Sequence, residues 1–200
     1  PTFIEQTGIA GAAVTDARMY RGLAEILGLT QQYLAPGRDY AADLAERIQI
    51  ANKMIAAGAR FVHVHSKVTD EAGHTKDPWA KLKALEALDP GLDGLETLAD
   101  RAIVAVTGDH ATPSVDGVLH TGDPTPLVLV GPTVRPDAVM EFGELHARHG
   151  WYGVVQAREL LPLMLSHANR PLFLSHRATP RQTLGLPDHP EPMPLIELCE

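Results

Sequence analysis

The chain of 200 residues contains one cysteine and no long apolar run. Because Cys199 has no internal partner, an intrachain disulfide framework is excluded, and we expect a cytoplasmic protein. No apolar run approaches the roughly 20 residues that cross a bilayer. The first residues also lack the charged and hydrophobic regions of a secretory signal. The sequence therefore predicts neither a membrane-spanning nor a secreted protein.

Basic residues are fewer than acidic ones, with 17 lysines and arginines against 25 aspartates and glutamates and a net charge of −8. This balance disfavours a binder of nucleic acid or of another polyanion, although it leaves room for a locally positive pocket that holds a metal. A hydrophobic content of 44% over this length is enough to bury one sizeable core. We therefore expect one folded domain.

Prolines are concentrated at the C-terminus, where the last thirty residues contain six of them. Because proline cannot donate a backbone hydrogen bond, this segment cannot form a regular helix or a central strand. We expect residues 1–170 to form the domain and residues 171–200 to form an extended, proline-rich tail. The chain also begins at Pro1 rather than methionine, which predicts that the numbering starts inside a longer reading frame or after processing.

Apolar, β-favouring runs alternate with helix-like stretches along the first 170 residues, as in proteins built from strand, crossover helix and parallel strand. We predict strands near residues 11–15, 60–65, 102–107 and 126–130. We predict helices near residues 18–27, 40–57, 79–98, 138–149 and 157–169. Leucines in the third helix form an apolar stripe that we expect to pack on a sheet, with a break or kink at Pro90 and Gly91. The predicted fold is α/β, with three α/β/α layers and a mostly parallel sheet.

Five carboxylate and imidazole side chains follow the predicted strands: Asp70, His74, Asp109, His110 and His120. The carboxyl ends of parallel strands meet at one edge of a sheet, so these side chains are expected to converge. Carboxylate oxygen and neutral imidazole nitrogen are ligands that Mn or Zn takes from proteins. The pattern predicts a two-metal centre, in which Asp70, His74 and His120 hold one ion and leave it an open position.

Simpler explanations exist for some of these histidines. A lone Asp70–His74 pair is more commonly a capped turn with a surface histidine, and only its register with the other three donors favours ligation. His63 and His65 share one strand face and could line the site, although packed or hydrogen-bonded structural histidines are more common.

The motifs resemble the alkaline phosphatase superfamily and, within it, the archaeal type of cofactor-independent phosphoglycerate mutase. Residues 61–74, 106–114 and 120–127 carry most of the resemblance, and further matches lie at residues 21–29 and 84–89. In this order, the motifs span roughly residues 10 to 165. The resemblance implies an alkaline-phosphatase-like fold and a soluble, glycolytic isomerase that converts 3-phosphoglycerate to 2-phosphoglycerate.

The resemblance also implies a role for each matched residue. Asp70, His74 and His120 would bind one divalent ion, Mn or Zn, and Asp109 and His110 would supply half the ligands of a second ion. Lys67 and Arg21 would contact the phosphate of a small phosphorylated substrate, with Arg21 standing where lysine is more usual. In the family, a metal-activated serine takes the phosphoryl group and returns it to the other hydroxyl of glycerate.

One part of the family pattern is missing. In the family, the nucleophilic serine and the first metal-binding aspartate lie in an N-terminal half of the protein. Neither motif is present in these 200 residues, so the catalytic nucleophile is unknown. Neither Ser66 nor Ser114 is assigned to this role. Residues 1–170 resemble the second half of the catalytic domain. The chain would be a fragment, would associate with a missing N-terminal half or another copy, or would have lost the mutase reaction. A metal-dependent phosphohydrolase and a catalytically incomplete metal-binding subunit stay open as alternatives.

Overall fold

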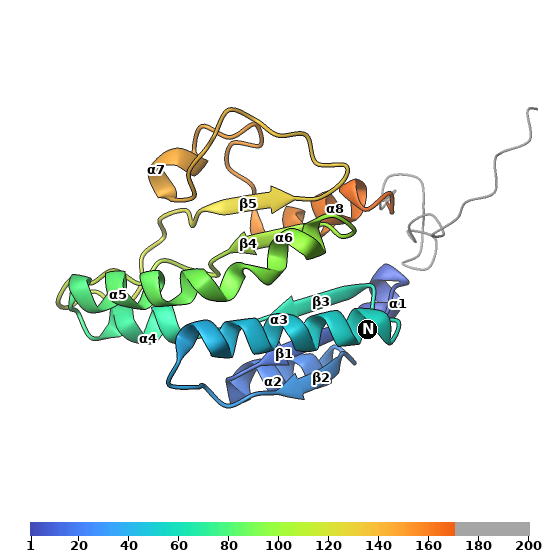
Figure 1. Cartoon of the computed structure of the whole chain (residues 1–200), viewed down its shortest axis with the longest axis horizontal. Coiled ribbons are helices and arrows are strands. Elements are labelled where there is room, and N and C mark those ends of the chain that lie inside the picture. Colours follow the sequence, from blue (N-terminus) through green and yellow to red (C-terminus); the bar gives the residue numbers. More distant parts are fainter. Residues whose placement is uncertain (171–200) are drawn as a thin grey trace, which may run out of the picture.

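The computed structural model describes residues 1–170, which contain five strands, eight α-helices and one short 3₁₀ helix (Figure 1). In chain order the elements are α1 (Phe3–Thr7), β1 (Gly11–Thr15), α2 (Arg18–Ile26), β2 (Thr30–Tyr33), α3 (Tyr40–Ala56), β3 (Phe61–Val64), α4 (Val68–His74), α5 (Pro78–Leu88), η1 (Asp89–Leu92), α6 (Gly94–Ala99), β4 (Val104–Thr107), β5 (Leu127–Val130), α7 (Glu144–Ala147) and α8 (Ala157–His167). The predicted tail, residues 171–200, lies outside the described residues. No helix in the described part is both long and apolar enough to cross a membrane.

Three strands form a parallel sheet in the order β2-β1-β3. The central strand β1 is buried, with Ala12, Ala13 and Val14 at most 2% exposed. The chain leaves β1 through α2 to reach β2 on one side, and returns through α3 to β3 on the other side. Because such crossovers are right-handed, they place α2 and α3 on opposite faces of the sheet, and Figure 1 shows α3 in front of the strands. The predicted α/β fold with a parallel sheet between helices is confirmed.

The other two strands form a separate antiparallel pair, β4 with β5. Both strands were predicted, but not this pairing. The loop between them, residues 108–126, contains no helix that could carry the chain across the sheet, and a parallel neighbour needs such a crossover. The loop instead brings the second strand back alongside the first, and it carries three of the five predicted ligands.

The long helix predicted over residues 79–98 is divided into α5, η1 and α6, with the break at Pro90 and Gly91 as expected. A Cβ on Gly91 would lie 2.6 Å from the carbonyl oxygen of Ala41, so glycine allows η1 to approach α3 closely. The expected packing of the leucine stripe on a sheet holds only at its C-terminal end, where α6 contacts β4, and is wrong for α5. Helix α5 packs against α3 and α4, and Trp79 is 68% exposed.

The helix predicted over residues 138–149 is also wrong, because only α7 is helical there. The Asp137 carboxylate accepts hydrogen bonds from the backbone N–H groups of Val139 (2.9 Å) and Trp151 (3.1 Å) and so closes this segment into a loop. Apolar residues that a packed helix would bury are exposed, including Met140 at 90%.

Three elements were not predicted: α1, β2 and α4. Helix α1 begins with a capping box, in which Thr2 and Glu5 bond each other's backbone N–H. Its Phe3 packs with Ile9 and with Leu165 of α8 in a small core cluster. Strand β2 lies at the edge of the sheet and is mostly exposed, so it lacks an apolar pattern.

Candidate metal centre

Helix α4 presents Asp70 and His74 on one face. Their spacing of four residues is that of neighbours on a helix, and the Asp70 Oδ1 and His74 Nε2 atoms are 3.2 Å apart. The sequence indicates no helix here, because Gly73 favours a turn, but in the structure both residues belong to α4. A close contact explains the glycine at position 73: a Cβ there would lie 2.8 Å from the carbonyl oxygen of Thr112. Glycine thus lets α4 approach the loop that carries the other ligands.

His120 completes a group of three donors. Its Nε2 atom lies 3.3 Å from Nε2 of His74 and 3.7 Å from Oδ1 of Asp70. Two atoms that each lie about 2.1 Å from one ion are at most about 4.2 Å apart, and all three separations meet this limit. One carboxylate and two imidazoles suit a divalent ion and leave it an open coordination position. Asp70, His74 and His120 therefore form a candidate metal site, brought together as the sequence predicted.

Two lysines fix the loop that carries His120. The Lys76 ammonium donates to the carbonyl oxygens of Pro113 (3.1 Å) and Val118 (2.5 Å), and the Lys81 ammonium donates to that of Thr112 (2.6 Å). A backbone bridge between Ala111 and Thr121 closes the same loop. Sequence reasoning missed both lysines, because no sequence motif marks a lysine that donates hydrogen bonds to backbone carbonyl oxygens.

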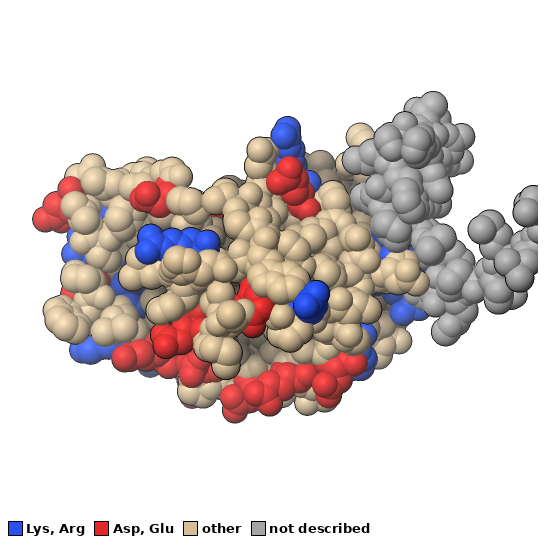
Figure 2. Space-filling view, turned by 90° about the horizontal axis from the view of Figure 1, so that it is seen from above, with Lys and Arg blue, Asp and Glu red and all other residues tan. Residues whose placement is uncertain are grey.

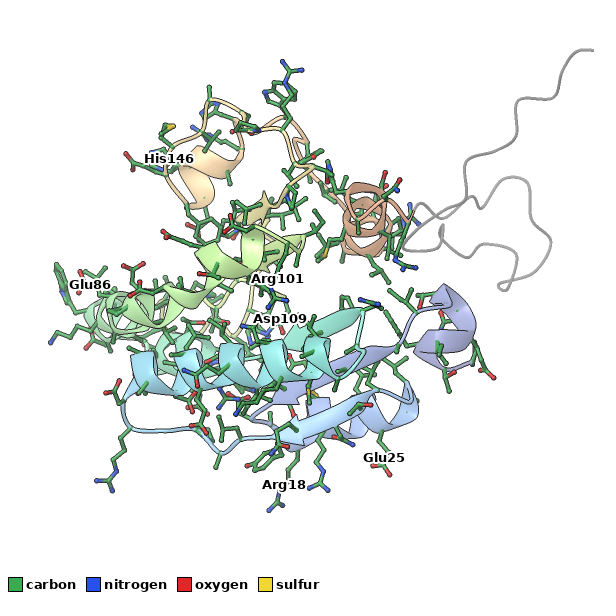
Figure 3. All side chains as sticks on the ribbon, turned by 45° about the vertical axis from the view of Figure 1, so that its right-hand side comes forward. Arg18, Glu25, Glu86, Arg101, Asp109 and His146 are labelled. Atoms are coloured by element: carbon green, nitrogen blue, oxygen red, sulfur yellow. The ribbon has the colours of Figure 1, made fainter. Side chains whose placement is uncertain are left out.

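Asp109 and His110 lie directly after β4, where the strand reaches the same region. Asp109 Oδ2 is 3.7 Å from His110 Nε2, a separation that one ion can span. The ring of His110 is centred 4.0 Å from that of His120, so this pair adjoins the three-donor site. Figure 3 shows Asp109 in the central part of the molecule, far from Glu86 and His146 at its periphery. The described residues give this second site two ligands, which is fewer than a catalytic ion needs.

The Thr112 hydroxyl connects the two groups of ligands. It donates a hydrogen bond of 2.7 Å to Asp70 Oδ1 and lies 3.1 Å from His110 Nδ1. Since its one proton goes to the carboxylate, the hydroxyl must accept from an Nδ1–H of His110. A neutral His110 then has its lone pair on Nε2, the atom that faces Asp109. Sequence reasoning missed Thr112, although it belongs to the motif that follows β4.

Local interactions keep the two carboxylates ionised. Burial acts to raise the pKa of Asp70, but the Thr112 hydrogen bond and the nearby His74 and Lys67 outweigh it, so the pKa lies below its ordinary value. Burial likewise acts to raise the pKa of Asp109, and the Tyr20 hydroxyl and His110 outweigh it to give a lowered value. An ionised carboxylate is the form that binds a metal.

The two predicted phosphate contacts differ in their surroundings. The Lys67 ammonium lies 3.4 Å from Asp70 Oδ2 and is therefore beside the three-donor site. Arg21 is exposed on α2, and the structure brings it into no hydrogen bond or ion pair with a ligand among the described residues. Both phosphate contacts stay predictions. The hydroxyl oxygens of Ser66 and Ser114 are buried without a hydrogen-bond partner in the described part of the chain, so neither is presented as a nucleophile.

A buried polar group behind the site was not predicted. Asp16 follows β1 directly and accepts from the Lys67 backbone N–H (3.0 Å), and it lies 2.9 Å from His65 Nδ1. Arg47 on α3 is fully buried, lies 3.8 Å from Asp16 and makes two hydrogen bonds to Asp43. The position of Asp16 at a strand's carboxyl end was a signal in the sequence, but that of Arg47 within a helix was not.

Comparison with known proteins identifies the family. The model of the Metalloenzyme superfamily matches residues 1–167. The chain belongs to the metalloenzyme superfamily. Its similarity to other members covers the described fold and its five candidate ligands, which confirms the family to which the motifs pointed.

Several curated members of the superfamily are similar to this chain. A 2,3-bisphosphoglycerate-independent phosphoglycerate mutase 2 of Methanocaldococcus jannaschii is 30% identical over 199 residues, a coverage of 100% of this chain and 43% of that protein. A 2,3-bisphosphoglycerate-independent phosphoglycerate mutase of Ignicoccus hospitalis is 37% identical over 177 residues, which are 85% of this chain and 41% of that protein. The chain thus spans about two fifths of the length of these relatives.

Solved structures of similar proteins share the fold. A Pyrococcus horikoshii protein superimposes with a TM-score of 0.74 and 28% identity, over 83% of this chain and 51% of that one. A cofactor-independent phosphoglycerate mutase of Thermoplasma acidophilum superimposes with a TM-score of 0.62 and 22% identity, over 83% of this chain and 38% of that one. The fold of this metalloenzyme superfamily member is therefore shared over most of the chain.

Proposed function

We propose that this chain is the C-terminal, metal-binding part of a 2,3-bisphosphoglycerate-independent phosphoglycerate mutase, an isomerase that converts 3-phosphoglycerate to 2-phosphoglycerate. The observation that carries the proposal is the convergence of Asp70, His74 and His120. Their donor atoms lie 3.2 to 3.7 Å apart, although His120 is 46 residues from His74 along the chain. The similarity to curated mutases supports this choice of reaction.

Each residue has a defined task in this proposal. Asp70, His74 and His120 hold one ion, Mn or Zn, and Asp109 and His110 supply part of the ligand set of a second. When bound, two such ions neutralise negative charge on a phosphoryl group in transfer. The Lys67 ammonium, at the edge of the site, and the Arg21 guanidinium attract the substrate phosphate.

The catalytic site in this proposal is completed by a second polypeptide segment. The second ion has two ligands among the described residues, and the chain spans 41 to 43% of its curated relatives. Residues 1–170 are, in this proposal, the second half of the catalytic domain. The segment with the nucleophilic serine belongs to the same longer protein, to a separate chain or to another copy. An alternative, favoured by the same two-ligand site, is a metal-binding subunit without turnover.

The charge of the surface agrees with a small substrate. Acidic side chains form the larger clusters on the face shown in Figure 2, where lysines and arginines are scattered. With a net charge of −8, the protein would repel nucleic acid. A small phosphate ester needs only a few local cations, and this fits a cytoplasmic glycolytic enzyme.

Ion binding tests the metal centre. Equilibrium dialysis of the chain against Mn²⁺ and, separately, Zn²⁺ should detect one tightly bound ion per chain. The variants H74A and H120A should each lose it, because two donors hold an ion far more weakly than three. The matched control is H146A, since His146 lies on α7 beside Glu141 and away from the site. Equal binding by all four proteins would refute the proposed centre.

Turnover tests the reaction. The chain alone, loaded with Mn²⁺ and given 3-phosphoglycerate, should form no 2-phosphoglycerate. Addition of the N-terminal half of the Methanocaldococcus jannaschii mutase should restore isomerisation. Release of free phosphate without the isomer would instead indicate a phosphohydrolase. One bound ion without either product, in the presence of the complementary half, would indicate a subunit that has lost catalysis.

A further inference from the structure

The Tyr20 hydroxyl connects the N-terminal sheet to the second group of ligands. It lies on α2 and donates a hydrogen bond of 2.6 Å to Oδ2 of Asp109, which is 89 residues away. The other carboxylate oxygen, Oδ1, accepts from the backbone N–H of His110 at 3.1 Å. Each carboxylate oxygen can accept more than one hydrogen bond or ion contact, so both keep a lone pair for a cation.

Asp109 needs such a partner to hold one orientation. Its side chain is 57% exposed and follows the end of β4 at the start of a long loop. Burial does not fix an exposed carboxylate, and free rotation would carry it away from His110 Nε2. The phenol is the side-chain donor that the structure provides to this carboxylate, and it comes from a separate, packed element.

The imidazole ring of His65 packs against the ring of Tyr20. The two rings are centred 3.8 Å apart, so the imidazole supports the face of the phenol ring. His65 is oriented in turn by Asp16, whose Oδ1 lies 2.9 Å from His65 Nδ1, and the Asp16 side chain is 1% exposed. This arrangement fixes the ring plane of His65 and leaves its Nε2 on the side away from Asp16.

Arg47 anchors the far end of this series. Its guanidinium is fully buried, lies 3.8 Å from Asp16 and donates at 3.3 Å to the backbone carbonyl of His65. Two further hydrogen bonds to Asp43 hold it on α3. The series Arg47, Asp16, His65 and Tyr20 thus runs from a rigid interior to one candidate metal ligand.

We propose that Tyr20 is a positioning residue that orients Asp109 for a second divalent cation shared with His110, and that the Asp16–His65 pair holds Tyr20 in place. The inference rests on the proposed metal centre. Hydrogen-bond donors to ligating carboxylates typically change metal affinity 10- to 100-fold. A tyrosine that only filled space would be replaced by phenylalanine without effect, and this difference separates the two roles.

A titration of the chain with Zn²⁺, followed by ¹⁵N NMR of the histidine rings, reads the two sites separately. The ring nitrogen that binds the metal shifts, so His74 and His120 report the first ion and His110 reports the second. In the wild-type chain, His74 and His120 should respond first and His110 at a higher Zn²⁺ concentration. In Y20F, His110 should need at least about tenfold more Zn²⁺, while the response of His74 and His120 stays the same.

Two further variants serve as a control for Y20F and as a test of the role of His65. Y33F is the matched control, because Tyr33 lies on β2 and its hydroxyl makes no hydrogen bond within the described residues. H65A should weaken binding at His110 in the wild-type chain but add little in Y20F, since both changes act through one hydroxyl.

Other outcomes would contradict the role of Tyr20, the role of His65 or the metal centre itself. A His110 response that is equal in the wild type and Y20F, or absent in the wild type, would overturn the role of Tyr20. Additive losses in H65A and Y20F would overturn the role of His65. A chain in which His74 and His120 do not respond either would refute the metal centre itself, and with it this inference.

Discussion

The hydroxyl of Thr112 serves both groups of ligands at once. It donates to Asp70 and accepts from His110 Nδ1, so it orients one carboxylate and fixes the tautomer of one imidazole. Thr112 is only 4% exposed, so water cannot readily replace it. A residue that binds no ion can therefore determine how two ligands present their lone pairs.

Replacement of Thr112 tests this role. T112V keeps the shape of the side chain and removes the hydroxyl, so Asp70 loses a donor and His110 loses its acceptor. We expect the affinity of the Asp70–His74–His120 site for Zn²⁺ to fall about 10- to 100-fold, measured by competition with a chelator. T112S should keep most of the affinity. The control is T30V on the exposed edge strand β2, and an equal effect of T30V and T112V would contradict the role.

Among the elements, α4 shows both the reach and the limit of sequence reasoning. Asp70 and His74 were identified as a pair that could share an ion, because their spacing and their place after a strand were visible. The helix itself was not predicted, since Gly73 reads as a turn residue. Glycine is needed at position 73 because the backbone of Thr112, 39 positions later, lies close to it. A contact between residues so far apart leaves no local signal in the sequence.

The same distinction holds for other elements. Strand β1, with a continuous apolar run, was predicted at its observed bounds, because burial on both faces leaves a clear pattern. Edge strand β2 has no such pattern, and the pairing of β4 with β5 depends on a loop whose path is set by Lys76 and Lys81. The five candidate ligands were identified in the sequence by residue type and position, whereas Tyr20, Thr112 and Arg47 contact partners far away in sequence.

Two glycine-to-alanine variants test the packing of α4. G73A favours the helix by roughly 0.5–1 kcal/mol, but its Cβ would lie 2.8 Å from the Thr112 carbonyl oxygen, and overpacking costs about 1–3 kcal/mol. We expect no gain in the free energy of unfolding, and a several-fold loss of Zn²⁺ affinity as α4 moves away from Thr112. G22A is the control, because a Cβ at Gly22 on α2 meets nothing within 4 Å.

G22A should therefore stabilise the chain by about 0.5–1 kcal/mol, with unchanged Zn²⁺ affinity. Denaturant unfolding and chelator competition measure the two quantities. If G73A stabilised the chain as much as G22A and bound Zn²⁺ equally well, then the close approach of α4 to Thr112 would have no consequence for the site.

At the scale of the whole molecule, one buried ionic group connects the elements that carry the site. Arg47 on α3 bonds the carbonyl oxygens of Leu34 after β2 and His65 after β3, and it lies beside Asp16 after β1. The carboxyl ends of all three parallel strands are therefore held by one guanidinium. The positions of Tyr20 and Lys67 relative to each other depend on this arrangement.

Removal of that guanidinium should be costly. R47M leaves the carboxylates of Asp16 and Asp43 buried without their cation, and breaking such a group typically costs about 3–5 kcal/mol. The measurement is the free energy of unfolding in denaturant. K53M on the same helix, where Lys53 is exposed, should change it little. A stability equal to that of K53M would show that Arg47 does not hold the strand ends together.

Acid should weaken the same region, and the sign follows from Asp16. Burial acts to raise its pKa, but the hydrogen bonds from His65 and the Lys67 backbone and the charges of His65 and Arg47 outweigh it, so the folded-state pKa is lowered. The unfolded chain then takes up the proton first as the pH falls. The stabilisation is complete above the ordinary carboxyl pKa and is lost as the pH falls toward the lower, folded-state value.

The free energy of unfolding should therefore decrease as the pH is lowered through the carboxyl range, when it is measured by denaturant titration at a series of pH values. D16N has no carboxylate to protonate and should show a shallower decrease, together with lower stability at neutral pH because Arg47 loses an ionic partner. The lowered pKa values of Asp70 and Asp109 have the same sign, so part of the decrease should persist in D16N. An equally steep decrease in both proteins would mean that Asp16 does not couple protonation to folding.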